Sequence, residues 1–235
     1  MGNNTNEQHA LLTDYDTNTA YSQAYHTLFA NIRFHWNTDN TAQSPVPDVH
    51  TLLLTTPSYY DEQAAVAANL AIVAAQSGTP VILVDADLRT PKLEKRFGLG
   101  KHPGLSDILQ DEGQVTAERI TSCLQTTYVD GLKLIGAGTT TEKGSSLLLS
   151  TKLQDVVTCI CDVLASEMEE NRAGIVIFHS APVVAGADAS LIGALVEQTL
   201  LTIVVGSTTR ASAKQAQEQL QQAHTKLAGV VMLKP

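Results

Sequence analysis

The residues most able to do chemistry follow three apolar segments that have the composition of buried strands. The first segment leads into residues 57–64, the second ends at Asp85, Asp87 and Arg89, and the third ends at His179. Ligands of open α/β sheets bind outside the carboxyl ends of the strands. If the three strands share a sheet, we expect these side chains to form one site. The alternative is that loops at strand ends are polar simply because they meet water.

Residues 52–78 have the layout of a phosphate-binding loop, in which a strand leads through a turn into an Ala-rich helix. Such a turn normally holds glycines whose N–H groups surround the phosphates, a lysine that neutralises them and a hydroxyl that coordinates Mg²⁺. The turn of this chain holds other residues: Ser58, Tyr59, Tyr60, Asp61, Glu62, Gln63 and Ala64. The layout therefore suggests a nucleotide site, and the composition argues against one.

Composition restricts the class of protein. The chain has 235 residues, of which 43% are hydrophobic and 17% charged, which suits a globular fold. A net charge of −9 disfavours nucleic acid and anionic membranes as partners. We find no apolar run of membrane-spanning length and no secretory signal. With an odd number of cysteines, three, the chain is expected in the reduced cytoplasm.

Strand and helix patterns alternate along most of the chain. We expect a disordered segment over 1–18, a helix over 19–36, a linker over 37–49 and an α/β domain over 50–235. Near-continuous apolar strands indicate a parallel sheet covered on both faces. The predicted fold is a single doubly wound, mostly parallel sheet flanked by helices. Strands are expected over 50–56, 80–87, 132–138, 174–182, 200–207 and 228–234, and the main helices over 61–77, 150–168, 187–198 and 211–226.

The predicted helix over 19–36 has apolar residues at roughly helical spacing. Thr19 is a candidate N-cap, because its hydroxyl can accept a hydrogen bond from the first helical turn. The expected apolar face consists of Ala20, Ala24, Leu28, Ile32 and Phe34.

The stretch VILVDADLRTPKLEKRFGLGKHPGLSDIL, residues 81–109, resembles the second Walker motif of bacterial tyrosine kinases. These are cytoplasmic kinase domains or subunits that regulate capsule and exopolysaccharide synthesis. The resemblance covers about residues 20–235 and includes the regions 23–34, 175–220 and 227–235. It implies a P-loop NTPase-like fold, shared with the partitioning and septum-positioning ATPases of the MinD and ParA type.

Against this family the chain departs at the residues that hold nucleotide. The matching segment AANLAIV places the phosphate loop on Ser58 to Ala64, with Ser58 and Glu62 for the two glycines, Gln63 for the lysine and Ala64 for the hydroxyl. His179 replaces the aspartate that lies near Mg²⁺ in the family, and imidazole is a poor ligand for that ion.

Of two other family features, the chain keeps the second Walker motif and lacks the charged residues of the N-terminal helix. The second Walker motif is retained as Asp85-Ala86-Asp87-Leu88-Arg89, and the first aspartate of that motif lies near metal and acceptor hydroxyl in the family. The family's N-terminal helix carries a Glu and two Arg, three apart, that assemble rings. Those positions are Gln23, His26 and Phe29 here, which makes the same subunit contact doubtful.

Electrostatics oppose an ordinary nucleotide site. Two like charges about 4 Å apart repel by roughly 1 kcal/mol in bulk water and by about 4 kcal/mol at a surface-like dielectric. Asp61 and Glu62 lie where a triphosphate would lie. One hypothesis is that either carboxylate caps the following helix in place of phosphate. The simpler alternative is that acidic residues are common in any first helical turn.

Several side chains have more than one interpretation. Tyr59 and Tyr60 could fill the vacated space, contact a partner or accept a phosphate. His179 is either a pH-sensitive group beside Asp85 or a neutral buried imidazole. A hydrolase triad of Ser180, His179 and Asp188 is disfavoured because adjacent strand residues point to opposite faces.

The sequence therefore predicts a pseudokinase, a catalytically impaired relative of bacterial tyrosine kinases that acts as an adaptor or regulator of polysaccharide synthesis and export. We expect no cofactor, and as partner a membrane polysaccharide copolymerase or an active kinase paralogue, with a homo-oligomer also open. Such a protein would be cytoplasmic or held at the inner membrane through its partner. The first alternative is an unconventional ATP- and Mg²⁺-dependent tyrosine kinase or ATPase that uses Asp85 and Asp87. The second is a partitioning-type protein.

Overall fold

The computed structural model describes residues 11–12, 19–39, 48–139, 144–170 and 172–234. Most of the predicted disordered segment 1–18 and of the predicted linker lies outside these residues. Leu11 and Leu12 are described and buried, and the Leu12 N–H donates to Asn69 Oδ1 at 2.9 Å.

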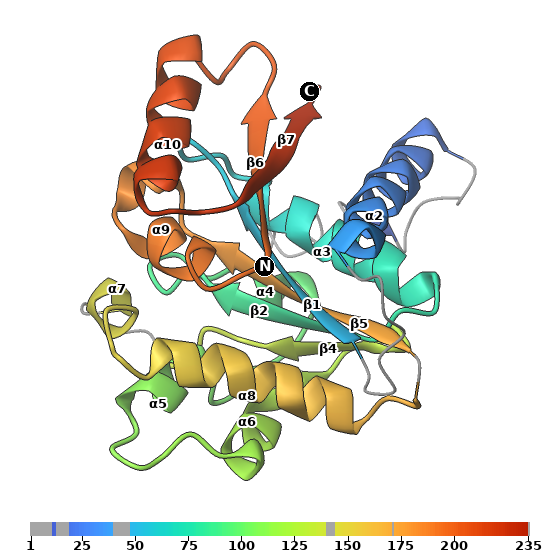
Figure 1. Ribbon diagram of the computed structural model, residues 1–235, viewed down its shortest axis with the longest axis vertical. Helices are drawn as coiled ribbons and strands as arrows, with labels where there is room; N and C mark the ends of the chain where they lie inside the picture. The colour runs from blue at the N-terminus through green and yellow to red at the C-terminus, as the bar shows by residue number, and fades with distance from the viewer. Residues whose placement is uncertain (1–10, 13–18, 40–47, 140–143, 171, 235) are drawn as a thin grey trace, which may run out of the picture.

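Within the described residues, seven strands form one sheet in the order β3-β4-β2-β5-β1-β6-β7 (Figure 1). All neighbours are parallel except β3 and β4, which are antiparallel. The doubly wound, mostly parallel sheet that the sequence predicts is confirmed, and β3 is an additional strand. The strands are β1 (Asp48–Thr55), β2 (Val81–Ala86), β3 (Leu124–Thr126), β4 (Leu132–Ile135), β5 (Ala173–Ser180), β6 (Gln198–Val204) and β7 (Leu227–Leu233).

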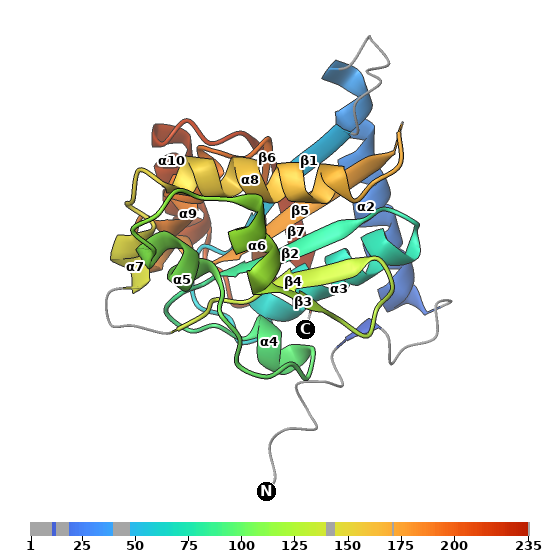
Figure 2. The ribbon, with the colours of Figure 1, turned by 90° about the horizontal axis from the view of Figure 1, so that it is seen from below.

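Helices cover both faces of the sheet (Figure 2). One buried cluster joins the sheet to α2 and α3, and the other joins it to α5, α6, α8, α9 and α10. The helices are α2 (Ala20–Asp39), α3 (Gln63–Gln76), α4 (Leu93–Arg96), α5 (Leu105–Gln110), α6 (Ala117–Cys123), α7 (Gly144–Leu147), α8 (Leu153–Ser166), α9 (Asp188–Gly193) and α10 (Arg210–Gln222), with a 3₁₀ turn at η2 (Val183–Ala185).

The α3 helix shows why the centre of the domain is tightly packed. Its residues from Gln63 to Ala75 are all buried, and most of them are alanine or β-branched residues. Small side chains let the helix approach the sheet closely, so the chain end that precedes α3 has a fixed position above the carboxyl ends of β1, β2 and β5.

The α2 helix is present but presents a different face from the predicted one. It extends to Asp39, beyond the expected end at residue 36. The Thr19 hydroxyl accepts the Ser22 N–H at 3.1 Å, which confirms the predicted N-cap. The buried residues are Tyr25, Phe29, Ile32 and Trp36, whereas Ala20, Ala24 and Phe34 of the predicted face are exposed.

Aromatic contacts explain the orientation of α2. Trp36 stacks on His50 of β1 with ring centroids 4.2 Å apart, and Phe29 meets Trp36 edge to face at 5.9 Å. Large rings bury more apolar area than alanine, so they determine which side of the helix faces the domain. Phe29, one of the family's ring-assembly positions, therefore packs inside this chain's own core.

The contrast between two phenylalanines of α2 gives a test of this docking. Phe29 is 3% exposed and Phe34 is 68% exposed. We expect Phe29→Ala to lower the free energy of unfolding by about 3–5 kcal/mol, because it leaves a cavity between α2 and the sheet. The matched control Phe34→Ala is expected to change it by less than about 0.5 kcal/mol. Urea unfolding followed by tryptophan fluorescence measures both, and equal effects would contradict this orientation of α2.

Candidate functional site

The structure brings the three polar strand ends together. β2 and β5 pair so that Asp85 lies opposite His179, and β5 pairs with β1 so that His179 also lies opposite Leu54. The Thr55 hydroxyl donates to the Ala181 carbonyl oxygen at 3.1 Å, which joins the ends of β1 and β5. The carboxyl ends of three neighbouring strands therefore surround one region, as the sequence predicts.

Polar contacts within the chain close the loop between β1 and α3. The Thr56 hydroxyl lies 2.8 Å from Gln63 Oε1 and 2.9 Å from the Ser58 carbonyl oxygen. The Thr56 carbonyl oxygen accepts the Val183 N–H at 2.8 Å. The predicted position of the first loop glycine, Ser58, is wrong: counted back six residues from Gln63, it falls on Pro57, which has no N–H to offer a phosphate.

The two loop carboxylates have different surroundings, and neither caps α3 in the predicted way. Glu62 occupies the N-cap position, but its Oε2 lies 3.0 Å from Arg96 Nη2 of α4. The Asp61 side chain is fully exposed, 3.6 Å from Lys92 Nζ. An exposed ion pair of this kind adds little stability. The hypothesis of internal helix capping is therefore replaced by ion pairing with a neighbouring helix.

Two cations of α4 and its N-terminal flank hold this loop, and the sequence analysis did not single them out. Arg96, whose side chain is 2% exposed, lies 3.4 Å from the Asp61 carbonyl oxygen as well as against Glu62. Lys92 Nζ lies 3.3 Å from the same carbonyl oxygen. The i, i+4 spacing of Lys92 and Arg96 just after the strand end was the available signal.

The two aspartates of the second Walker motif bind backbone. Asp85 Oδ2 accepts the N–H groups of Lys92 and Leu93 at 3.0 and 2.9 Å, and its Oδ1 accepts the Asp87 N–H at 3.2 Å. Asp87 accepts the N–H groups of Arg89 and Thr90 at 3.2 and 3.0 Å. Both carboxyl groups are buried, so they organise the segment between β2 and α4.

Arg89 turns toward a third aspartate. Its Nε lies 3.1 Å from Oδ2 of Asp188, whose side chain is 3% exposed. The hydrogen bond to Asp188 raises the pKa of Arg89 above its ordinary value. Asp188 is thereby engaged with Arg89, and the Ser180 hydroxyl donates to the Ala181 carbonyl oxygen at 3.0 Å. These contacts hold Asp188 and Ser180 to partners outside the trio of Ser180, His179 and Asp188, and the exclusion of a hydrolase triad stays a prediction.

Burial dominates the titration of Asp85 and His179. Desolvation raises the pKa of Asp85 to about 7, although its three N–H donors favour the ionised form. Desolvation also lowers the pKa of His179 to about 4, so the imidazole is neutral near pH 7. Of the two interpretations of His179, the structure favours the neutral buried imidazole.

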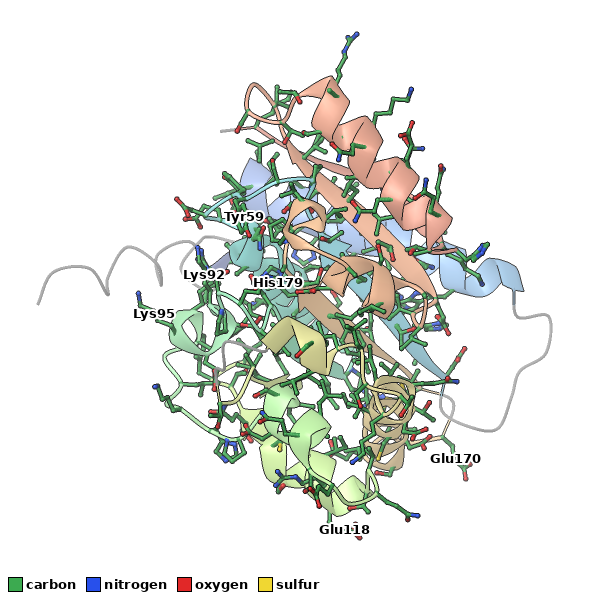
Figure 3. All side chains as sticks on the ribbon, turned by 90° about the vertical axis from the view of Figure 1, so that its left-hand side faces the viewer. Tyr59, Lys92, Lys95, Glu118, Glu170 and His179 are labelled. Carbon is green, nitrogen blue, oxygen red and sulfur yellow. The ribbon has the colours of Figure 1, made fainter. Side chains whose placement is uncertain are left out.

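The two loop tyrosines differ in exposure. Tyr59 is 65% exposed and lies at the surface of the loop (Figure 3), so it does not fill the vacated space. Tyr60 is partly buried, and the pKa of its phenol is raised by desolvation and then by the Glu62 carboxylate. Tyr59 is therefore the exposed aromatic side chain of the loop.

Among the residues whose placement is described, no group of three or more His, Cys, Asp and Glu side chains has the arrangement of a metal site. None of the helices in the described ranges is long and apolar enough to cross a bilayer.

The known proteins that resemble this chain in sequence include several tyrosine-protein kinases of bacteria. No protein-family model matches the chain. It is 29% identical over 211 residues to the tyrosine-protein kinase YwqD of Bacillus subtilis. The match covers 90% of this chain and 80% of YwqD. The chain is a homologue of the bacterial tyrosine kinases. The chain is 31% identical over 180 residues to a putative tyrosine-protein kinase, EpsB of Ralstonia solanacearum. The match covers 77% of this chain but 22% of the length of EpsB.

Solved structures support the fold. The kinase domain of the Escherichia coli tyrosine kinase ETK has a TM-score of 0.78 at 22% identity, covering 97% of this homologue and 79% of that chain. The chimerical protein CapA2B2 has a TM-score of 0.74 at 22% identity, covering 95% and 88%. The septum site-determining protein MinD of Pyrococcus horikoshii has a TM-score of 0.60 at 15% identity, covering 78% and 70%. These TM-scores establish a shared fold, and at identities of 22% or less they show the fold alone.

The pKa shifts of Asp85 and His179 predict opposite pH dependences of the free energy of unfolding. The folded pKa of Asp85 lies above its ordinary value, so its stabilising contribution is present at low pH and is lost as pH rises from about 4 to about 7. The folded pKa of His179 lies below its ordinary value, so its contribution appears as pH rises from about 4 to about 6.5. The two contributions largely cancel in the unmodified protein.

Two variants separate these contributions. We expect the free energy of unfolding of Asp85→Asn to rise with pH between about 4 and 6.5, and that of His179→Gln to fall, each relative to the unmodified protein. Urea titrations at several pH values measure the slopes. Parallel stability curves for all three proteins would contradict the assigned shifts.

Proposed function

We propose that this homologue is a catalytically impaired relative of the bacterial tyrosine kinases and acts as an adaptor or regulator of capsular or exopolysaccharide synthesis and export. The observation that carries the proposal is the loop between β1 and α3. Its Glu62 carboxylate is paired with Arg96 at 3.0 Å, and its Gln63 amide lies 2.8 Å from the Thr56 hydroxyl. These contacts occupy the groups that would otherwise meet a phosphate.

The residues of the loop do not fit Mg²⁺ and a triphosphate. Ala64 offers no hydroxyl to the metal, and Gln63 offers no positive charge to the phosphates. Asp85 and Asp87 accept backbone N–H groups, which uses the oxygens that a hard cation would need. We therefore derive no catalytic step through a bound nucleotide.

The negative charge of the loop also opposes the binding of a triphosphate. A triphosphate entering the loop would approach Asp61 and Glu62 and would have to displace Glu62 from the Arg96 guanidinium. Removing one partner of a pair that involves a buried charge is costly, because the remaining charge loses its compensation. This cost would be subtracted from any affinity that the loop retains.

An adaptor needs a surface for its partner. Tyr59, exposed at the tip of the loop, is a candidate contact, since exposed aromatic side chains are frequent at interfaces. The proposed partner is a membrane polysaccharide copolymerase or an active kinase paralogue, which would hold this protein at the cytoplasmic side of the inner membrane.

One observation favours the enzymatic alternative. Lys92 approaches the loop from outside it, with Nζ 3.3 Å from the Asp61 carbonyl oxygen. A lysine supplied by the segment before α4 could neutralise phosphate in place of the missing loop lysine. The likeness to MinD gives no comparable support to a partitioning function, since at 15% identity it concerns the fold.

Calorimetry with Mg-ATP tests the proposal directly. We expect no saturable binding in the loop, corresponding to a dissociation constant weaker than about 1 mM. The variants Asp85→Ala and Lys92→Ala should leave the heat signal unchanged, as should the distant control Lys214→Ala. Micromolar binding that is lost in Asp85→Ala and Lys92→Ala, but kept in Lys214→Ala, would establish the enzymatic alternative.

A cellular experiment tests the adaptor role. In the native host, polysaccharide output should depend on the presence of the protein and should persist when Lys92→Ala replaces the unmodified chain. We expect Tyr59→Asp to reduce output, because a charge at the exposed loop tip would weaken a partner contact, while Tyr128→Asp serves as an exposed tyrosine control. Loss of output in Lys92→Ala, at equal protein level, would contradict a non-catalytic role.

A further inference from the structure

The strand β7 forms one edge of the sheet, and its outer side has no neighbouring strand among the described residues (Figure 1). The other edge strand, β3, has three residues, whereas β7 has seven. Proteins usually protect a long edge with proline, a charged side chain or a bulge, because its unpaired N–H and C=O groups can pair with another chain. Between Leu227 and Leu233 there is neither proline nor charge, and the pairing with β6 is regular from Gly229 onward. The edge is therefore open to a further strand.

The open backbone groups of β7 can be assigned from its pairing with β6. The Leu233 carbonyl oxygen accepts the Val205 N–H at 2.9 Å, so the backbone groups of Leu233 are directed to β6. Because this direction alternates along a strand, the N–H and C=O groups of Val230 and Met232 are directed to the open edge. Their side chains share one face of the sheet and are 52% and 61% exposed. An added strand would gain main-chain hydrogen bonds and apolar contacts from the same two residues.

On the opposite face, a small hollow lies between α2 and the strands β6 and β7. Its volume is about 180 Å³, and its lining includes Leu28 and Ile32 of α2, Leu200 of β6 and Val231 of β7. This volume is below that of usual small-molecule sites. The hollow suits an apolar side chain of a strand that runs beside β7, since alternate side chains of such a strand would point toward α2. Both faces of the edge thus favour an apolar partner segment.

The charge of this part of the chain differs from that of the rest. Residues 198–235, which include β6, α10 and β7, hold four basic residues and one acidic residue, a net charge of +3. Residues 1–197 hold 11 basic and 23 acidic residues, a net charge of −12. Lys226 and Lys234 lie directly before and after β7, both are exposed, and neither has an ion pair in the part of the chain that the structure describes. Acidic residues of a partner would match these two charges.

The same lysines argue against a second copy of this chain as the added strand. Two copies related by a twofold axis would pair β7 with β7 in antiparallel fashion. With Val230 at the centre, Lys226 of one copy would lie opposite Lys234 of the other. Like charges directly opposite each other destabilise a strand pair. A segment with acidic residues at both ends would instead be attracted in either strand direction.

We propose that β7 binds an extended apolar segment of a partner protein, flanked by acidic residues, as an additional strand of the sheet. In such recognition, main-chain hydrogen bonds provide affinity and side-chain pockets provide specificity. Val230 and Met232 would supply the hydrogen bonds, and the hollow beside α2 would hold a side chain. Lys226 and Lys234 would select the acidic flanks. No residue of the loop between β1 and α3 takes part, so the proposal does not depend on whether that loop binds nucleotide.

Amide chemical shifts of the ¹⁵N-labelled full chain test the edge, with a synthetic peptide of alternating Val and Thr that has Asp at both ends as the probe. We expect saturable shifts over β7 and at Leu28 and Ile32. The same peptide with Lys at both ends should bind at least about tenfold more weakly, because attraction becomes repulsion. Lys226→Glu combined with Lys234→Glu should reverse this preference. Lys101→Glu combined with Lys214→Glu, which changes the net charge equally, should keep it.

A backbone substitution separates strand addition from simple charge attraction. Val230→Pro removes an N–H that is directed to the open edge and leaves the bonds to β6 intact, a position where proline is tolerated. We expect it to weaken binding of the Asp-flanked peptide by about tenfold or more. Val230→Thr keeps the N–H and a similar shape, so it should retain binding within about threefold. If Val230→Pro does not fold, the charge reversal decides the question.

The proposal is overturned by an absence of saturable shifts, by equal binding of the two peptides, or by equal binding to folded Val230→Pro and Val230→Thr. It is also overturned if sedimentation shows a dimer that Val230→Pro abolishes, because the edge would then serve a second copy. Tyr59→Asp should leave peptide binding unchanged. A failure of this proposal can therefore be told apart from a failure of the function proposed above.

Discussion

The carboxyl group of Asp85 fixes the position of α4, and much of the structure around the candidate site depends on it. Asp85 is fully buried at the end of β2 and holds the N–H groups of Lys92 and Leu93. A helix of four residues has too few internal hydrogen bonds to be stable by itself, so its start must be held by other groups. Burial disfavours the charge on Asp85, and the N–H donors partly offset that cost.

From this fixed start, α4 serves two neighbouring regions. Arg96 is directed to the loop before α3, where the buried guanidinium meets Glu62. Glu94 and Lys95 line a hollow that the residues from 99 to 103 and Gly138 and Thr139 complete. The acid at Glu62 and the base at Arg96 suit each other, since a buried guanidinium without a carboxylate would be strongly destabilising. Glu62 of the loop and Arg96 of α4 thus each supply the charge that the other needs.

Much of the fold could be predicted from the sequence. The apolar runs of β2 and β5 are long enough to identify buried parallel strands, and their polar ends predicted that Asp85 and His179 meet. The β3 strand was missed because three residues, Leu-Gln-Thr, carry no alternation to detect. The face of α2 was wrong because spacing alone weighted alanines equally with the aromatic rings that actually pack.

The partners of the loop carboxylates could not be found from sequence. Glu62 and Arg96 are 34 positions apart, and the i, i+4 spacing of Lys92 and Arg96 indicates a shared helix face but not what that face meets. The close packing of Gly138 against Asp107 is equally invisible before the segments that carry these two residues are placed side by side. Long-range charge pairing and backbone contact are consequences of the folded chain, and they decide the detail of the loop and of the segments packed around Asp107.

The Glu62–Arg96 contact has a consequence for timing in the cell. Nucleotide-dependent switch proteins change shape as they bind and hydrolyse a nucleotide, so the rate of hydrolysis sets how long each state lasts. A loop that supplies its own counter-charge keeps a single arrangement and, under the proposed function, runs no such cycle. The strength of its signal would then be set by how many copies the cell makes and how long each copy survives.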